Sequence, residues 1–206
     1  MQNILLSTTY FGPVQWYQKL YRAEEVFIEH CESFQKQTYR NRCIIATTNG
    51  PQPLTVPVER GQGDQIRSLR ISDHGNWRHL HWNALKSAYG ESPFFDYYQD
   101  DIRPFFEQRW DYLFDFNEAI REKMCELLDI QPKVVPTELF LSPAEIKENT
   151  FGTDYREAIR PKHPEPDPDF TPKRYYQVYE QKHGFLPNLS VLDLLFNMGP
   201  ESIFYL

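Results

Sequence analysis

The spacing of apolar residues changes twice within the first thirty positions of the chain. Three consecutive apolar residues, Ile4 to Leu6, are typical of a short buried strand, which Gly12-Pro13 ends. Pro13 suits the first turn of a helix, and the apolar residues from Trp16 to Ala23 follow at helical spacing. A further apolar segment at 25–29 predicts a second strand. A strand, a helix and a strand within so short a segment predict a βαβ unit with parallel strands.

The next apolar segments predict a hairpin and one additional strand. Residues 42–47 are expected to form a third strand, which Asn49-Gly50 ends as a turn signal. Residues 53–58 then form a fourth strand that is antiparallel to the third, and Pro57 places it at an edge or a bulge. The alternation of apolar and polar residues at 65–71 indicates another short strand.

The following segments are predicted to be helical. Asn76 is a candidate N-cap for a helix over 77–89. A second helical segment over 97–110 is broken by an internal proline. The acidic residues at 115–118 have the spacing of a capping box, which opens a strongly periodic helix that continues to Leu128.

A short apolar run at 133–136 predicts a last strand, after which the chain changes character. Five prolines fall between 161 and 172, which is typical of an extended arm. Ser190 and Asp193 have capping-box spacing for a short apolar helix, and Gly199-Pro200 ends that helix. An apolar helix of this kind is expected to dock back onto the core.

These elements predict an α/β fold, in which an N-terminal βαβ-containing mixed sheet precedes a largely helical C-terminal half with a proline-rich arm. We expect an α/β core domain over residues 1–150. Residues 151–206 then form a C-terminal arm and docking helix, either within the same domain or as an appendage. The apolar fraction of 40% suffices for a core at this length. The aromatic fraction of 16% is high enough for a packed interior or an aromatic-walled pocket.

The formal net charge of the chain is -7, and the charge is unevenly distributed. Residues 36–86 contain eight basic and three acidic residues, so this segment carries a net charge of +5 and the rest carries -12. The asymmetry argues for a local anion site. It argues against nucleic-acid binding, for which the domain as a whole should be basic.

Cysteine usage and hydropathy argue against several further classes of protein. The three cysteines are scattered and form no CxxC pair, so neither a disulfide framework nor a metal site is predicted. The sequence has no signal-peptide pattern and no apolar segment long enough for a transmembrane helix. We therefore expect a cytoplasmic protein without a membrane span.

A basic, aromatic and amide-rich segment, residues 34–42, separates two apolar strands. Arginine presents paired donors that suit carboxylates and phosphates, and Asn and Gln both donate and accept. In a βαβ unit, the turn after the first strand and the loop after the second lie at the same edge of the sheet. The candidate substrate-binding residues at this predicted crevice are Tyr10, Gln15, Trp16, Lys36, Arg40, Asn41 and Arg42, with Glu138 after the last predicted strand. A solvated connector is the alternative interpretation of residues 34–42.

Candidate proton-transfer residues come from two segments. His79 lies on a polar face of its predicted helix, whereas His81 lies on the core face, so His79 is a candidate general acid or base. His30 and Glu32 end the second predicted strand, where they would reach the crevice. Cys31 is disfavoured as a nucleophile because acidic neighbours raise the pKa of its thiol. The sequence contains no GxGxxG, Walker A, GxSxG or HExxH motif.

Several of these segments, in this order, resemble the WbqC-like family. The residues that carry the resemblance are Tyr10-Phe11-Gly12-Pro13, Lys19, Val26-Phe27-Ile28, Gln37 to Arg42, Leu54 to Val58, Trp77, His79, His81, Leu85, Tyr89 and Pro93-Phe94-Phe95. The tail, comprising Gly184 to Ser190, Leu194 to Asn197 and Gly199-Pro200, resembles a Bacteroidetes-type subgroup of the family. The resemblance covers nearly the whole chain, and Asn41-Arg42 and Leu54 to Val58 are its most specific parts.

Members of this family occur in gene clusters for O-antigen and other surface polysaccharides, and a glycine transferase role has been suggested for some. The resemblance therefore implies a cytoplasmic step on an activated sugar or on its amino group. The chain departs from the family pattern after the second predicted strand, where Cys31-Glu32 replaces an acidic pair. The first strand, turn and helix also resemble nucleotidylyltransferases, but Pro13 to Trp16 replaces their HxGH motif.

Three functional hypotheses follow from the sequence. The first is an enzyme that binds a nucleotide sugar or another phosphate-bearing small molecule and transfers an acyl or aminoacyl group to a sugar amine. Arg40 and Arg42 would hold the anionic group, and His79 or Glu32 would move the proton. The second is a non-catalytic anion- or sugar-binding scaffold of the same pathway, and the third is a divergent nucleotidylyltransferase-like enzyme. The cofactor, the identity of the substrate and the oligomeric state stay open.

Overall fold

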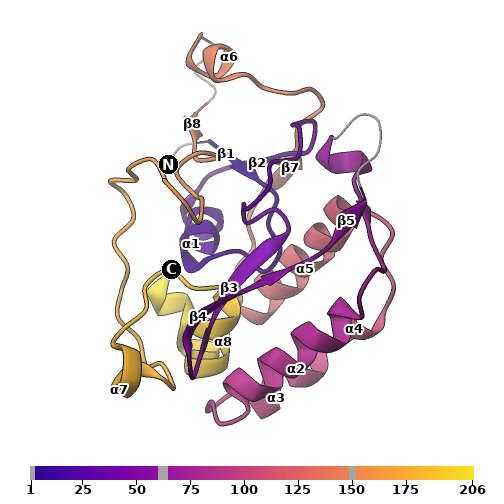
Figure 1. The fold of residues 1–206 in the computed structure, drawn as a ribbon. Coiled ribbons are helices and arrows are strands. Elements are labelled where there is room, and N and C mark those ends of the chain that lie inside the picture. Colours follow the sequence, from indigo (N-terminus) through magenta and orange to yellow (C-terminus); the bar gives the residue numbers. More distant parts are fainter. Residues whose placement is uncertain (1–2, 60–64, 149–151) are drawn as a thin grey trace.

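The computed structural model describes residues 3–59, 65–148 and 152–206. Its main sheet has four parallel strands in the order β7-β2-β1-β8 (Figure 1). The strands β1 (Ile4–Ser7) and β2 (Val26–Glu29) are joined by helix α1 (Val14–Arg22). Ile4 lies opposite Val26 in a parallel register. The predicted α/β fold and its parallel βαβ unit are therefore confirmed.

The two outer strands of the main sheet come from distant parts of the chain. The predicted last strand, β7 (Val134–Pro136), pairs with β2, whereas β8 (Thr153–Asp154) pairs with β1. The sequence did not predict β8, because two polar residues give no apolar periodicity. The chain thus passes from β1 to β2 and β7 on one side of the sheet and returns to β8 on the other side. The direction in which strands are added to the sheet therefore reverses between β1 and β8. Open α/β sheets commonly bind ligands at such a switch point.

Two short antiparallel sheets accompany the main sheet. The strands β3 (Arg42–Thr47) and β4 (Gly50–Thr55) form the predicted antiparallel hairpin, with Arg42 opposite Thr55. The second strand of the hairpin begins and ends three residues earlier than the predicted strand over 53–58. The strands β5 (Val58–Glu59) and β6 (Arg70–Ile71) form a second pair. The strand predicted over 65–71 is confined to its end, β6, because a 3-10 helix (Ile66–Ser68) occupies the preceding residues.

Four helices lie together on one side of the molecule (Figure 1). They are α2 (Trp77–Tyr89), α3 (Phe95–Ile102), α4 (Pro104–Glu107) and α5 (Leu113–Leu127). Helix α6 (Pro143–Glu148) lies apart from them, near β8. The bounds of α2 match the prediction. Asn76 precedes α2 as expected, but its side chain makes no capping hydrogen bond. The predicted capping box at 115–118 was wrong, because α5 begins at Leu113 and contains both acidic residues.

The C-terminal part of the chain wraps around the core. From β8, the proline-rich arm runs down one side of the molecule to α7 (Glu180–His183), shown in orange in Figure 1. Helix α8 (Val191–Met198) is buried along nearly its whole length, as predicted for a docking helix, and a 3-10 helix (Gly199–Tyr205) follows it. Ser190 caps α8 by accepting a hydrogen bond from the Leu192 N–H, but Asp193 is buried and bonds elsewhere.

The aromatic residues largely fill the interior. Tyr10, Phe11, Trp16 and Tyr17 are buried together with aromatic side chains of α3, α4, α5 and α8. Phe11 adopts a positive φ of 40° in the turn between β1 and α1. In the part of the chain that the structure describes, every helix is too short or too polar to traverse a lipid bilayer.

Candidate functional site

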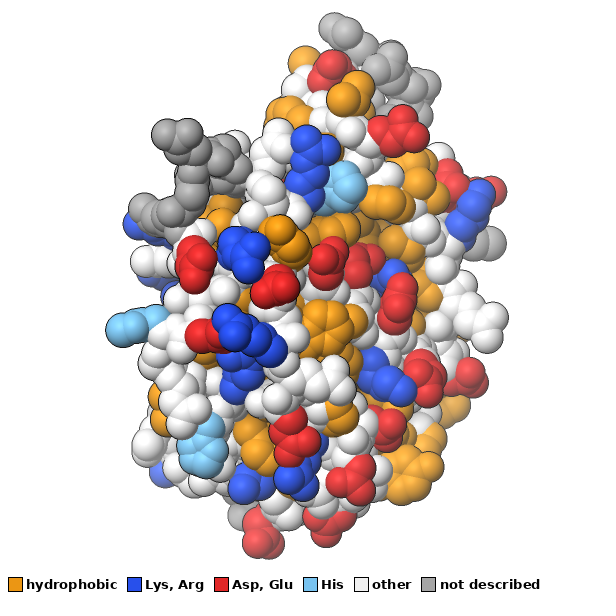
Figure 2. All heavy atoms as spheres, turned by 90° about the vertical axis from the view of Figure 1, so that its right-hand side faces the viewer, with side chains coloured by type: hydrophobic (Ala, Val, Ile, Leu, Met, Phe, Trp, Pro, Cys, Tyr) orange, Lys and Arg blue, Asp and Glu red, His pale blue; other side chains and the backbone are white. Residues whose placement is uncertain are grey.

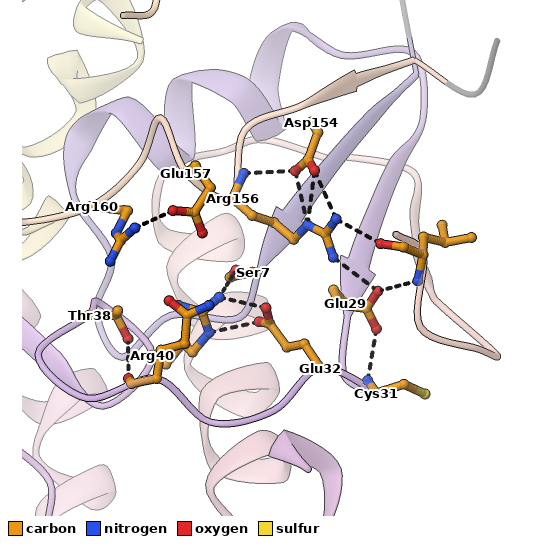
Figure 3. A network of polar contacts seen from close by, with 12 residues as sticks. Ser7, Glu29, Cys31, Glu32, Thr38, Arg40, Asp154, Arg156, Glu157 and Arg160 are labelled. Carbon is orange, nitrogen blue, oxygen red and sulfur yellow. Dashed lines mark hydrogen bonds and ion pairs between the residues drawn. The ribbon is translucent and has the colours of Figure 1, made fainter. Parts of the chain in front are cut away.

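Two polar regions stand out in the structure, and the first lies at the carboxyl edge of the main sheet. Its residues end or follow β1, β2 and β8, so the parallel sheet itself brings them together. Figure 3 shows the side chains of this sheet-edge network, including Ser7, Glu32, Arg40, Asp154 and Arg156. The first pair in it joins two residues that the sequence had singled out independently.

Arg40 and Glu32 form a bidentate ion pair. Arg40 Nε lies 2.7 Å from Oε1 of Glu32, and Nη2 lies 2.6 Å from Oε2. Arg40 Nη2 also donates to the Ser7 hydroxyl at 2.7 Å. Both charged side chains are at most 5% exposed. Because Glu32 neutralises Arg40, this arginine does not offer an uncompensated positive charge to a ligand.

A second buried arginine, Arg156, lies beside this pair. Its Nε donates to Oδ1 of Asp154 at 3.0 Å, and its Nη2 donates to Oδ2 of Asp154 at 2.8 Å and to the Leu141 carbonyl at 2.8 Å. Its Nη1 lies 3.4 Å from Oε2 of Glu29, which is fully buried. Glu29 also accepts from the Cys31 N–H at 2.8 Å. Glu29 and Arg156 therefore tie the ends of β2 and β8 together.

The second polar region is an open groove of about 700 Å³ on the side formed by α2, α3 and α4. Figure 2 looks onto the helical side of the molecule, where basic and acidic side chains are intermixed with exposed apolar ones. The groove is lined by Asp73, Asn76, Trp77, Arg78, His79, Trp82, Asn83, Lys86, Gln99, Arg103, Phe106, Glu107, Gln108 and Arg109. We refer to it as the α2–α4 groove.

The α2–α4 groove is positively charged, because four cations in its lining face only two carboxylates. Asp73 is shared by Arg78 Nη1 at 2.7 Å and Arg109 Nη2 at 2.6 Å. The hydrogen bond from Arg78 lowers the pKa of the Asp73 carboxyl, so Asp73 stays ionised at neutral pH. Among the described residues, Lys86 has no ion-pair partner. The groove therefore offers positive charge that its own carboxylates do not cancel.

The Arg78 guanidinium, in the wall of this groove, has hydrogen-bond donors that the described part of the protein leaves unpartnered. Its Nε and Nη2 are buried and have no hydrogen-bond partner among the described residues. The guanidinium carbon lies 4.6 Å from the ring centroid of Trp77. A half-buried indole, Trp82, stands 5.8 Å from the Phe106 ring in the same groove. The combination of cations, amides and aromatic rings suits a ligand that has both anionic and ring-shaped parts.

His79 is the one predicted proton-transfer residue in the α2–α4 groove. Its side chain is exposed, and Nδ2 of Asn83, one turn further along α2, lies 2.7 Å from its Nε2. The sequence interpretation required His79 to face a cleft, and the structure fulfils that requirement. His81, on the opposite face of α2, is buried, and burial lowers its pKa to about 4.

The predicted crevice between the β1–α1 turn and residues 36–42 is not open. These segments do lie side by side, as expected for a βαβ unit, but they pack directly: the Tyr10 N–H donates to the Tyr39 carbonyl at 2.9 Å. Tyr10 is fully buried, with its hydroxyl 2.9 Å from Nδ1 of His81. Trp16 is also buried and donates from Nε1 to the Ser7 carbonyl. Tyr10 and Trp16, which the sequence had suggested as the aromatic wall of a ligand site, therefore belong to the packed core.

Three other predicted binding residues make contacts within the protein. Asn41 Nδ2 donates to the Val56 carbonyl at 2.8 Å, and Arg42 Nε donates to Oγ1 of Thr55 at 2.9 Å. Gln15 Nε2 donates to Oδ2 of Asp167 at 2.8 Å. These contacts fix the hairpin and the arm.

The last three candidates do not converge on one site. His30 is half-buried, with its ring 4.9 Å from that of Phe114. Lys36 and Glu138 are exposed, and Glu138 does not pair with Arg40, which bonds Glu32 instead. In residues 3–59, 65–148 and 152–206, no three His, Cys, Asp or Glu side chains cluster as metal ligands.

Several polar residues of the sheet-edge network were missed from the sequence. Glu29, Asp154 and Arg156 meet only because β8 pairs with β1, which no local pattern predicted. Asp167 was seen only as part of the arm, although it bonds both Gln15 and Lys19. The one local signal was that Asp154 and Arg156 are two residues apart, a spacing that lets their opposite charges pair.

Comparisons with known proteins agree with the resemblance seen in the sequence. A curated protein of Mycobacterium tuberculosis (strain H37Rv), described as uncharacterised, is 26% identical over 226 positions, covering 100% of this chain and 98% of that protein. No solved structure matches the chain significantly. The model of the WbqC-like protein family matches residues 8–205. Because that match spans nearly the whole sequence, the chain belongs to the WbqC-like protein family.

Proposed function

We propose that the protein binds a phosphate-bearing sugar, such as a nucleotide sugar, in the α2–α4 groove and transfers an acyl or aminoacyl group to the sugar's amine. The observation that carries this proposal is that His79 shares one open, positively charged groove with amide and aromatic side chains. The reaction would be a cytoplasmic step in surface-polysaccharide or O-antigen synthesis, as the family resemblance implies. The assignment to a Bacteroidetes-type subgroup stays part of this proposal.

The lining of the groove suggests a division of roles. Arg103 and Lys86 suit phosphate oxygens, since guanidinium and ammonium groups form charge-assisted hydrogen bonds. Trp82 offers an aromatic face to a sugar or base, and Gln99 suits hydroxyl groups. The proposal thus moves the anion site from Arg40 and Arg42 to the α2–α4 groove.

The chemical step would use His79 as the proton acceptor. The sugar amine attacks the acyl carbon, a carbon–nitrogen bond forms, and the bond to the donor's leaving group breaks. The amine's proton passes to Nε2 of His79. Asn83 now presents its Nδ2 to that nitrogen. A half-turn of the amide would place the Asn83 Oδ1 there instead, so that it accepts a hydrogen bond from the imidazolium.

Calorimetric titration with nucleotide sugars tests where the ligand binds. Lys86→Ala and Arg103→Ala each remove a groove cation. Each should raise the dissociation constant about tenfold, equivalent to roughly 1.4 kcal/mol of binding free energy. Arg174→Ala is the matched control, because Arg174 is 75% exposed and paired with a carboxylate like Arg103, but lies on the arm. Equal weakening in the control, or no binding by the wild type, would contradict the proposal.

His79→Ala separates an enzyme from a scaffold. If His79 moves a proton, the variant should lose about 10²–10⁴-fold in transfer rate while its dissociation constant stays within a few-fold of wild type. A scaffold that only binds the sugar predicts instead that a strain carrying His79→Ala makes its surface polysaccharide normally.

A further inference from the structure

A small cavity lies at the switch point of the main sheet, away from the α2–α4 groove. It is lined by residues that follow β1 and β8, including Ser7, Thr8, Thr9 and Arg156, and by Arg40 and Trp16. Its volume is about 10 Å³, which is about the space that one water molecule needs. The fold therefore places a polar cavity where open α/β sheets bind ligands, but holds it nearly closed.

The lining of this cavity contains hydrogen-bonding groups that the protein leaves unused. Thr8 and Thr9 are 1% and 4% exposed, and neither hydroxyl has a hydrogen-bond partner among the described residues. Arg40 bonds Glu32 and Ser7 through Nε and Nη2, which leaves its Nη1 without a partner in the described part of the chain. Buried polar groups without partners are costly, at about 1–3 kcal/mol each. Because Thr8, Thr9 and Arg40 all line the cavity, a group bound there would be placed to complete these bonds.

The lining suits an oxyanion because it presents hydrogen-bond donors and no carboxylate, although the charges of its arginines are already compensated. Both buried arginines, Arg40 and Arg156, contribute to the cavity wall, whereas Glu29, Glu32 and Asp154 do not line it. The carboxylates therefore hold the arginines in place without facing the cavity. Two hydroxyls and guanidinium N–H groups together suit the oxygens of a carboxylate or a phosphate.

The arm covers this cavity. Tyr155, Arg156 and Ile159, at the start of the arm, form part of the wall. Asp167, further along, accepts from Gln15 Nε2 at 2.8 Å and from Lys19 Nζ at 2.9 Å. Both partners are on α1, so these bonds fasten the arm across the βαβ unit.

We propose that the switch-point cavity is a binding site for one oxyanion, a carboxylate or a phosphate group, and that the arm opens and closes it. A ligand larger than one oxygen atom enters only when the arm lifts. Most of residues 161–174 are exposed and are fastened by the polar bonds of Asp167. The wall residues Tyr155 and Ile159 are buried, so opening the cavity also moves apolar side chains out of the core. The site is separate from the α2–α4 groove, and its test does not depend on the function proposed for that groove.

Thermal unfolding of the full chain in inorganic phosphate or acetate, against chloride at equal ionic strength, tests this site. An oxyanion at ten times its dissociation constant should raise Tm by roughly 3–6 °C. The Thr8→Val/Thr9→Val variant removes both unpartnered hydroxyls at nearly constant volume and should lose this response. The Thr8→Ser/Thr9→Ser variant keeps the hydroxyls and should retain it.

Two further measurements make the result specific to this cavity. The Lys86→Ala variant controls for phosphate bound in the α2–α4 groove, and the switch-point response should survive it. Hydrogen exchange in residues 155–170 should slow when the effective anion is added, since a bound anion holds the arm closed. A response to phosphate alone identifies a phosphate site, and a response to acetate identifies a carboxylate site.

The proposal is overturned if neither anion raises Tm beyond chloride, if the response persists in Thr8→Val/Thr9→Val, or if it disappears in Lys86→Ala. Unchanged hydrogen exchange in the arm, with a Tm response present, overturns the role of the arm as the closing element.

Discussion

Arg40 and Glu32 face each other across a buried, bidentate ion pair in which both N···O distances are 2.7 Å or less. Removing one partner of such a pair leaves an uncompensated buried charge. We expect Glu32→Ala to lower the free energy of unfolding by about 3–5 kcal/mol, measured by urea denaturation. A double variant, Glu32→Leu/Arg40→Met, should lose less than Glu32→Ala alone, because it leaves no buried charge behind.

The exposed pair of Arg103 and Glu107 provides the control for this prediction. Both side chains are about half exposed, so Glu107→Ala should change the free energy of unfolding by less than about 1 kcal/mol. If Glu32→Ala lowered the free energy of unfolding by no more than Glu107→Ala does, the Arg40–Glu32 pair would contribute no more than a surface ion pair.

His81 should make the protein less stable in mild acid. Burial lowers the pKa of its imidazole to about 4, below the usual value of 6.5. The unfolded chain then binds the proton first as the pH falls, so stability that is fully present above about 6.5 is lost towards about 4. The loss should be about 3 kcal/mol. His81→Asn removes this contribution, so the difference in unfolding free energy between wild type and variant should change by about 3 kcal/mol from about pH 6.5 to about pH 4. A difference that does not change with pH would contradict the assignment.

Asp193 should act in the opposite direction. Burial raises the pKa of its carboxyl to about 6, although Tyr89, Tyr175 and Gln177 all donate hydrogen bonds to it. The folded state binds the proton more tightly, so stability is greatest below about pH 4 and falls as the pH rises to about 6. The fall should be about 3 kcal/mol. Asp193→Asn keeps an acceptor oxygen but cannot ionise, so the difference from wild type across this range measures the effect.

The two titrations overlap, so wild-type stability should change little between about pH 4 and 6, while each single variant should show a clear slope of opposite sign. Denaturant unfolding of the wild type and both variants at several pH values makes this comparison. Slopes of the same sign in both variants would be inconsistent with the two assignments.

Asp167 should control the mobility of the arm. It accepts bonds from Lys19 and Gln15, and its side chain is only 4% exposed. Asp167→Asn should make trypsin cleavage after Lys162 and Lys173 about tenfold faster, equivalent to a loss of roughly 1.4 kcal/mol in the cost of local opening. Asp169→Asn is the matched control, because Asp169 is exposed and its carboxylate accepts, among the described residues, only a long bond of 3.4 Å from the Tyr155 hydroxyl. Equal cleavage rates in both variants would show that the arm does not depend on the Asp167 contacts.

The parts of the fold predicted correctly are those with strong local periodicity. The segment from β1 to β2 and helix α2 have apolar spacing that only one type of element explains. The strand β8 has only two residues and shows no apolar periodicity. Its pairing with β1 places Ile4 opposite Thr153, which is 149 positions away in the sequence. Local patterns cannot predict such a pairing, and the position of the arm follows from it.

The candidate site was predicted only in part, for a similar reason. The helical position of His79 predicted that it would face solvent or a cleft, because a helix face follows from residue spacing. The partner of Arg40 does not follow from spacing, and neither does the burial of Tyr10 and Trp16, which results from packing against distant helices. An arginine in a polar segment therefore indicated an anion, but the anion is a carboxylate of the same chain.

Hydrogen exchange measured by mass spectrometry with and without a saturating nucleotide sugar tests the central claim most directly. The first N–H groups of α2 have no partner within the helix. Our account predicts that a bound ligand slows exchange in residues 73–86 and 99–109, which line the α2–α4 groove. Protection that is confined to the switch point and the arm, or absent from the whole chain, would contradict the assignment of the α2–α4 groove as the sugar-binding site.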